Sequence, residues 1–146
     1  MGPRTSRATS SPVSIPSRSS RAASQRTVPA FSAPLARRVA AELPASATAV
    51  NPVDVAGGGE QDITCFSRVT RAVLASGEVD ALLLSGYFGG YAEYSEDLAP
   101  AEVETAQTLA AAATECGRAL FVHSMYSAGA AAQALQGHMR GDQGAV

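Results

Sequence analysis

Two short apolar runs constrain the fold of this chain more than any other feature of its sequence. Residues 79–85 read VDALLLS and residues 119–123 read ALFVH. A continuous apolar run of this length is typical of a strand that is buried on both faces of a parallel sheet. A helical pattern over residues 100–116 separates the two runs, and strands that alternate with such helices indicate a parallel sheet with crossover helices. The sequence therefore predicts an α/β fold.

Helical spacing and stop signals place the elements before the first run. Leu35, Val39 and Leu43 recur at helical spacing, and Pro44 ends the helix that they predict. A short extended stretch is expected over residues 47–50, where Asn51-Pro52 ends it.

Three more helices are expected further along the chain. One spans residues 62–75 and presents one apolar face, formed by Ile63, Phe66, Val69, Thr70, Val73 and Leu74. The next begins near Pro100, which suits a first helical turn, and ends at Gly117, which suits a left-handed cap. A last short helix is expected over residues 127–135.

The near-neutral formal charge of −2 combines two opposed segments. Up to Ala41 there are seven arginines and no acidic residue, whereas the rest of the chain has four arginines against 13 acidic residues. Residues 1–33, rich in Ser, Arg and Pro, are expected to be a disordered extension, residues 34–136 a domain, and residues 137–146 an unstructured tail.

The basic extension leaves several interpretations open. It is compatible with an organelle transit peptide, a nucleic-acid tail or a phosphorylatable linker, and also with a poorly selected extension that has no function. It lacks a clear amphipathic helix, and no aromatic residue precedes Phe31 to stack on bases, so no nucleic-acid partner is expected.

Apolar length and cysteine content exclude two further classes of protein. The longest uncharged apolar stretch, residues 106–113, is far shorter than the roughly 20 residues that cross a bilayer, so no membrane partner is expected. Cys65 and Cys116 both lie in helical patterns, where buried thiols are expected rather than a disulfide framework or a metal cluster. A reducing, cytoplasmic location follows as the default.

The loops that follow the strands are the expected place for chemistry in such a sheet. Three segments qualify: residues 51–59, 86–97 and 123–126. The first two are rich in glycine, and glycines before a helix expose backbone N–H groups to an anion, most often a phosphate. Glycine serves ordinary tight turns equally well.

More specific motifs lie in the same loops. Asn51-Pro52-Val53-Asp54-Val55-Ala56-Gly57-Gly58-Gly59 is followed by the apolar run VDALLL at residues 79–84 and by Phe88-Gly89-Gly90. This order resembles the NDP-forming acyl-CoA synthetases, which include the ADP-forming acetate–CoA ligases. The resemblance is to their flavodoxin-like domain, related to the C-terminal part of the succinyl-CoA synthetase β subunit, and it covers residues 35–135.

The resemblance implies an incomplete flavodoxin-like three-layer domain with a parallel sheet. The family domain opens with a strand and a glycine-rich turn, where this chain has serine and arginine. It closes with a further strand, where this chain has residues 137–141, Gly-His-Met-Arg-Gly. The chain therefore resembles a fragment of such a synthetase.

The activity implied by the resemblance is that of an acid–thiol ligase. The family converts an acid, CoA and ATP into acyl-CoA, ADP and phosphate, through an acyl phosphate and a phosphohistidine, and uses CoA, ATP or ADP and magnesium. The catalytic histidine, the CoA-binding site and the ATP-grasp site belong to other domains or subunits, which are the implied partners. The isolated chain is expected to have no catalytic residue, no metal ligand and no cofactor of its own.

Two sets of residues carry over from the family. In the family, the start of the helix after the FGG turn helps hold the transferred phosphate. The resemblance therefore implies that Gly89, Gly90 and Tyr91 bind phosphate in this chain. A Gly90→Val change is expected to abolish phosphate binding without unfolding the chain. The role expected for the other set is to shape the first loop; its members are Asn51, Asp54, Gly57, Gly58 and Gly59.

Several side chains admit two interpretations each. His123 could be catalytic, but a role in capping its strand is favoured. The acids Glu93, Glu96 and Asp97 could act as an acid–base pair or bind magnesium, but a solvated stretch is favoured. The aromatic residues around the glycine turn could cover a ligand or pack against a partner domain; they are Tyr87, Phe88, Tyr91 and Tyr94.

Two other functions remain open at this point. The chain could be a noncatalytic docking module that uses its glycine loops and tyrosines to contact a synthetase subunit. It could also be the synthetase-like regulatory region of a protein acetyltransferase, although it contains no acetyltransferase domain.

Overall fold

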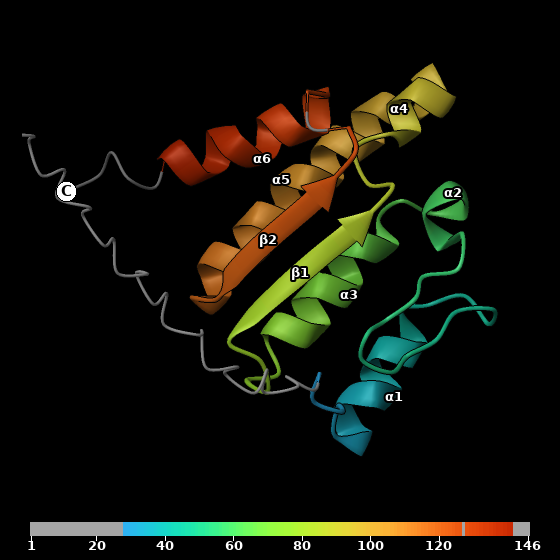
Figure 1. Cartoon of the computed structure of the whole chain (residues 1–146), viewed down its shortest axis with the longest axis vertical. Coiled ribbons are helices and arrows are strands. Elements are labelled where there is room, and N and C mark those ends of the chain that lie inside the picture. The colour runs from blue at the N-terminus through green and yellow to red at the C-terminus, as the bar shows by residue number, and fades with distance from the viewer. Residues whose placement is uncertain (1–27, 127, 142–146) are drawn as a thin grey trace, which may run out of the picture.

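The computed structural model describes residues 28–126 and 128–141 of the chain, which form a mixed α/β structure. About half of these residues are helical, and two strands form a small parallel sheet (Figure 1). The elements follow the order α1 (Ala33–Ala41), α2 (Gly58–Gln61), α3 (Cys65–Leu74), β1 (Ala81–Gly86), α4 (Tyr91–Tyr94), the 3₁₀ turn η1 (Glu96–Leu98), α5 (Ala99–Cys116), β2 (Ala119–Ser124) and α6 (Ala130–Gly141).

The two strands and the helix between them form the centre of the fold. β1 and β2 run parallel, in a register that pairs Ala81 with Ala119 and Gly86 with Ser124. α5 connects them and lies behind the sheet together with α3 (Figure 1). The predicted parallel strand–helix–strand arrangement is therefore confirmed. Gly117 adopts the left-handed conformation that ends α5, with φ of 59°.

The sheet is covered on one face only. Leu82, Leu84, Leu120 and Val122 are half-buried against the helices, whereas alternate residues point to the opposite face. On that face Leu83 is 66% exposed. Its partner in the register, Phe121, is 60% exposed. The expectation of strands buried on both faces is wrong, because the described residues supply helices to one side alone.

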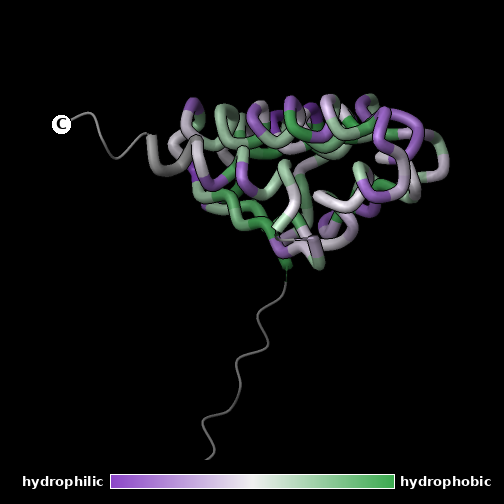
Figure 2. The backbone as a smooth tube through the Cα atoms, turned by 90° about the horizontal axis from the view of Figure 1, so that it is seen from above, coloured by the Kyte–Doolittle hydropathy of each residue, from purple (hydrophilic) through white to green (hydrophobic). Residues whose placement is uncertain are grey.

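The helices form a row along one side of the molecule when it is viewed from above (Figure 2). In this row hydrophilic and hydrophobic segments alternate from turn to turn, as amphipathic helices require. The face of α3 predicted from the sequence is the buried one, from Phe66 to Leu74.

Two apolar clusters form the core. The larger is centred on α5, where Leu109 and Ala106 are fully buried and contact residues of α3, α4 and α6. The smaller joins Leu35 and Val39 of α1 to Val69 and Val73 of α3. α3 therefore contributes to both clusters through different sides.

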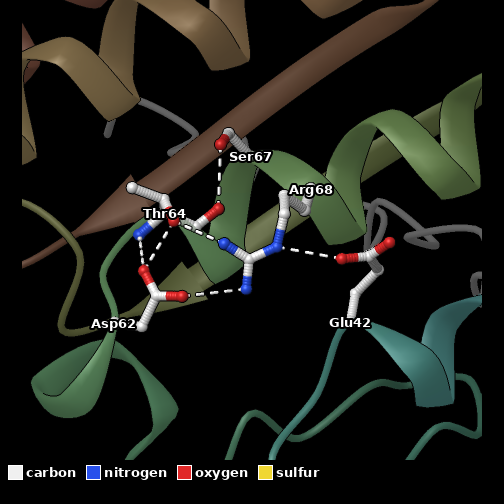
Figure 3. A network of polar contacts seen from close by, with 5 residues as sticks. All are labelled: Glu42, Asp62, Thr64, Ser67 and Arg68. Carbon is white, nitrogen blue, oxygen red and sulfur yellow. Dashed lines mark hydrogen bonds and ion pairs between the residues drawn. The ribbon is translucent and has the colours of Figure 1, made fainter.

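A polar network fixes the start of α3 beside the end of α1 (Figure 3). The guanidinium of Arg68 contacts the Glu42 carboxylate and the Asp62 carboxylate, each at 2.9 Å. Asp62 also accepts hydrogen bonds from the backbone N–H and the hydroxyl of Thr64. The network thus joins three segments that precede β1.

Some segments differ from their expected structure. Residues 47–50 do not form a strand: Thr48 instead makes a single antiparallel bridge with Asp54, because the chain turns back on itself at Asn51-Pro52. α6 begins later than expected and continues to Gly141, into the stretch expected to be an unstructured tail. Cys65 is buried as expected, whereas Cys116 is half-buried.

The expectations for residues 1–27 and 142–146 lie outside the described residues. Within the described part of the chain, no helix has the length and apolar character that crossing a membrane requires.

Candidate functional site

The three loops predicted to carry chemistry meet at the carboxyl end of the sheet. The loop at residues 54–60 and the end of β1 border a cavity of about 340 Å³, which Phe66, Phe88 and Tyr91 also line. From the third loop, the Ser124 hydroxyl donates a hydrogen bond to the carbonyl of Phe88. Residues far apart in sequence therefore form one site, as expected for the carboxyl ends of parallel strands.

The backbone of the glycine turn is bound by a carboxylate from its own chain. The Glu102 Oε1 atom accepts hydrogen bonds from the N–H groups of Gly89 and Tyr91, at 2.7 and 3.1 Å. The Oε2 atom accepts another from Ala92 at 3.1 Å. Glu102 lies in the first turn of α5 and is only 1% exposed. Of the three residues to which sequence analysis assigned a phosphate, Gly89 and Tyr91 therefore already donate their N–H groups to the Glu102 carboxyl group. The N–H of Gly90 donates to the carbonyl of Tyr87 at 2.9 Å.

Close packing explains the glycines of this turn. Gly89 has φ of 99°, a conformation that residues with a side chain rarely adopt. A Cβ atom on Gly90 would lie 2.4 Å from the ring of Tyr126. A valine at residue 90 must therefore displace Tyr126, so the expectation that Gly90→Val leaves the fold undisturbed does not agree with this packing.

The glycines of the first loop bring it against Tyr91. Gly57 has φ of 76° and precedes α2, and Gly58 and Gly59 are buried within that short helix. A Cβ atom on Gly59 would lie 2.2 Å from the hydroxyl of Tyr91, so only glycine permits this contact. The structure therefore places one predicted loop-shaping glycine, Gly59, next to one of the predicted phosphate-binding residues, Tyr91.

Asn51 and Asp54 make side-chain hydrogen bonds to the backbone. The Asp54 Oδ1 atom accepts from the N–H of Ala56 at 2.9 Å, which holds the turn that leads to Gly57. The Asn51 amide donates to the carbonyl of Pro29 at 3.0 Å and so links the loop to the segment before α1. Asn51 lies outside the residues that line the cavity, whereas Asp54 and Gly57 line it.

The ionisable side chains that line the cavity are acids and tyrosines. Burial, and then the nearby Cys65, Glu60 and Glu102, raise the pKa of Tyr91 to about 12. The Tyr126 hydroxyl is the main cause that raises the pKa of Tyr87, with smaller contributions from Glu93 and Glu60. No arginine lines the cavity, so Asp54 and Glu60 face no positive charge among its lining residues.

Aromatic rings form one wall of this region. Tyr87 packs edge to face with both Tyr91 and Tyr126, at centroid distances of 5.1 and 5.0 Å. Phe66 packs against Phe88 at 5.3 Å. Tyr94 is 74% exposed and lies outside these pairs. Three of the four aromatic residues singled out in the sequence therefore belong to the site.

The remaining candidate groups lie apart from the cavity or at its edge. His123 shares a hydrogen bond of 3.1 Å with Ser85 across the exposed face of the sheet. Glu93 lies in α4, and Glu96 and Asp97 lie in η1, all on the surface. The described residues contain no cluster of His, Cys, Asp or Glu that could hold a metal ion.

A second, larger hollow runs along β2. It has a volume of about 750 Å³, and all six residues of the strand line it. Because alternate residues of a strand point to opposite faces, a hollow that touches all six must follow the edge of the strand. Its other walls come from α5 and α6, through Ala110, Ala113, Ala132 and Leu135 among others.

Sequence reasoning missed Glu102 and Tyr126. An acid in the first turn of a helix is common, and nothing marked Glu102 as the one that reaches back to the glycine turn. Tyr126 stood in a recognised loop, but its contact with Gly90 depends on how the two loops meet.

Comparisons with protein-family models, with curated proteins and with solved structures found no match.

Proposed function

We propose that this chain is a flavodoxin-like subdomain of an NDP-forming acyl-CoA synthetase and that it acts there by docking rather than by making bonds. The order of the NPVD loop, the apolar strand and the FGG turn, in residues 51–90, supports the family. The mixed α/β structure with parallel strands is compatible with such a domain. The bond-making groups of the ligase reaction belong to partner domains in this proposal.

The observation that carries the docking role is the uncovered apolar face of the sheet. Parallel sheets are almost always covered on both faces. Here Leu83 and Phe121 are register partners, and both are more than half exposed. An exposed apolar surface of this kind marks a site of contact with another protein surface.

The hollow along β2 extends the same surface. A strand at the edge of a sheet has unpaired N–H and C=O groups, and charged residues or proline usually protect it from further pairing. β2 reads ALFVHS and contains neither proline nor a carboxylate or arginine. A CoA-binding or ATP-grasp partner that covers the open face could therefore also pair with this edge.

CoA, nucleotide and magnesium are assigned to the partners, because the described residues do not fit them. Glu102 occupies the N–H groups of Gly89, Tyr91 and Ala92, and a phosphate could take its place only after this carboxylate had moved. The adjoining cavity is lined by two carboxylates and no arginine. Phosphate binding at Gly89, Gly90 and Tyr91 stays a prediction, and docking is the favoured role.

Calorimetric titration of the full chain with the CoA-binding and ATP-grasp domains of an acyl-CoA synthetase tests the proposal. We expect association with one of these domains, and Leu83→Asp should weaken it at least about tenfold because a charge replaces an apolar contact. Glu104→Gln is the matched control, since Glu104 is exposed on α5, in the opposite layer. Absence of association, or equal affinity of the Leu83→Asp variant, would contradict the docking role.

A ligase assay on the same mixture distinguishes the synthetase assignment from a noncatalytic docking module that takes no part in ligase activity. ATP-dependent acyl-CoA formation that requires this chain would support the synthetase assignment. Association without such activity would favour the noncatalytic module instead.

A further inference from the structure

We propose that residues 12–16 of this chain, Pro-Val-Ser-Ile-Pro, add a third strand to the outer edge of β2, in the hollow between that edge and α6. This inference goes beyond docking, because it concerns the edge of the sheet in the chain on its own, whereas the proposed partner covers the open face. A partner would pair with the edge only after residues 12–16 had left it.

The hollow has room for a single extended segment but not for a second sheet with its helices. In the described part of the chain β2 pairs with β1 alone, so its outer edge still has N–H and C=O groups to offer. Beyond that edge α6 packs along α5, and Ala132 and Leu135 of α6 line the hollow (Figure 1). A second copy that continued the sheet through its own β2 would bring its α5 and α6 into the space that α6 fills. An extended segment has no helix layer and can add to an edge through backbone hydrogen bonds.

The side chains of residues 12–16 match the walls of the hollow. Val13 and Ile15 are β-branched, and they are the only large apolar residues between residues 2 and 27. They alternate with Ser14, so in an extended segment both point to the same face. On the helix side of the sheet that face would meet alanine and leucine side chains of α5 and α6.

The two prolines suit a strand that pairs on one side only. Backbone N–H groups of successive residues in a strand point alternately to its two sides. Pro12 and Pro16 are each two residues from Ser14, so the N–H groups that they lack belong to the side opposite to those of Val13 and Ile15. Val13 and Ile15 can therefore pair with β2 while the prolines face away from it, which is where an edge strand tolerates proline.

The length and charge of the chain allow this contact. The backbone N–H of Ser32 donates to the Glu78 carboxylate at 2.9 Å, and Glu78 closely precedes β1, so α1 begins at the amino end of the sheet. Residues 17–27 span up to about 36 Å when extended, against strand spacings of about 4.8 Å. A segment that arrives from this end runs antiparallel to β2. Seven arginines and no acid up to Ala41, against four arginines and 13 acids beyond it, favour the contact.

Hydrogen exchange of the full chain, followed by two-dimensional NMR, tests the proposal. Relative to the rates of an unstructured peptide, we expect the N–H groups of Val13 and Ile15 to exchange at least about tenfold more slowly than that of Ser14, because only the first two face β2. Nuclear Overhauser contacts are expected between the methyl groups of Ile15 and those of Leu120 or Leu135.

One pair of variants alters the segment. Val13→Ser combined with Ile15→Ser should remove the slow exchange at residues 13 and 15, because both apolar contacts are lost. The combination of Ala8→Ser with Ala22→Ser is the matched control, since it also introduces two serines into residues 1–27 but leaves residues 12–16 intact. It should keep the protection.

A second pair of variants alters the hollow. Ala132→Glu places a charge among the lining residues and should also release the segment. Gln133→Glu, which adds the same charge at an exposed neighbour on α6 outside the hollow, should not. The signal dispersion of each variant reports whether it is folded.

Several outcomes would overturn the inference. These are exchange of Val13 and Ile15 as fast as that of Ser14, or unchanged protection in the Val13→Ser/Ile15→Ser variant or in a folded Ala132→Glu variant. Protection that is lost on dilution would show that the segment of a second copy fills the edge instead. Failure of the docking experiment would leave the inference intact, because the exchange measurement uses this chain alone.

Discussion

Glu102 is the residue on which the shape of the site depends most. Its carboxylate accepts three backbone hydrogen bonds from the glycine turn in a buried position. Removing the acceptor leaves these N–H groups unpaired, and each buried unpaired group costs about 1–3 kcal/mol. We therefore expect Glu102→Ala to lower the free energy of unfolding by at least about 3 kcal/mol in urea titrations.

The matched control lies two residues further along α5. Glu104 is exposed, and Glu104→Gln should change stability by less than about 0.5 kcal/mol. Equal stability of the Glu102→Ala and Glu104→Gln variants would show that the glycine turn does not depend on the carboxylate.

The stability of the chain should also depend on the close contact between Gly90 and Tyr126. Because a Cβ atom on Gly90 would overlap the Tyr126 ring, we expect Gly90→Ala to destabilise the chain by about 1–3 kcal/mol. Replacing the ring by a small side chain removes the clash, so Gly90→Ala should cost much less in a Tyr126→Ala background. A double-mutant cycle measured by urea unfolding gives the coupling energy. A coupling energy near zero would mean that the two residues do not touch.

Among the elements, the segment that precedes α3 is held to that helix by a pair of charges that responds to pH, Asp62 and Arg68. Hydrogen bonds from Thr64, and then Arg68, hold the pKa of Asp62 below its ordinary value of 3.8. A carboxyl whose pKa is lower in the folded state stabilises the fold above its unfolded pKa, and this contribution disappears as the pH falls through the folded value. Both partners are about half exposed, which keeps the contribution to roughly 0.2–1 kcal/mol.

Asp62→Asn tests this pH dependence. At neutral pH the variant should be less stable than the original chain by that amount, and the difference should shrink at pH values well below the ordinary carboxyl range. High salt should also reduce it, since the pair is exposed. A stability difference that stays constant with pH would contradict the assignment to the ionised carboxylate.

The elements also show how far the sequence determines the fold. The apolar face of α3, the stop of α5 at Gly117 and the parallel strands follow from local patterns, and all agree with the structure. The open face of the sheet could not be predicted, because ALLLSG and ALFVHS are apolar enough to be buried on both sides. Burial of a strand depends on which elements pack against it, and that is not a local property.

At the scale of the whole molecule, the two core clusters divide the structure into parts of unequal stability. α5 contacts α3, α4, α6 and β2, and its Leu109 is fully buried. α1 contacts chiefly α3, and its buried side is formed by Leu35 and Val39 alone. Local opening should therefore be easier for α1 than for α5, since fewer buried contacts break.

Hydrogen exchange measures this order directly. We expect the backbone N–H groups of α5 around Leu109 to exchange slowest, with an opening free energy close to that of global unfolding, and those of α1 to exchange faster. Leu109→Ala should lower the free energy of unfolding by about 2–5 kcal/mol and accelerate exchange throughout the chain. Leu35→Ala should accelerate exchange mainly in α1, because the cluster that it disrupts is peripheral to α5. Equal protection of α1 and α5 in the unmodified chain would mean that the two clusters open as one unit, and that the contacts of α3 with both clusters are strong enough to couple them.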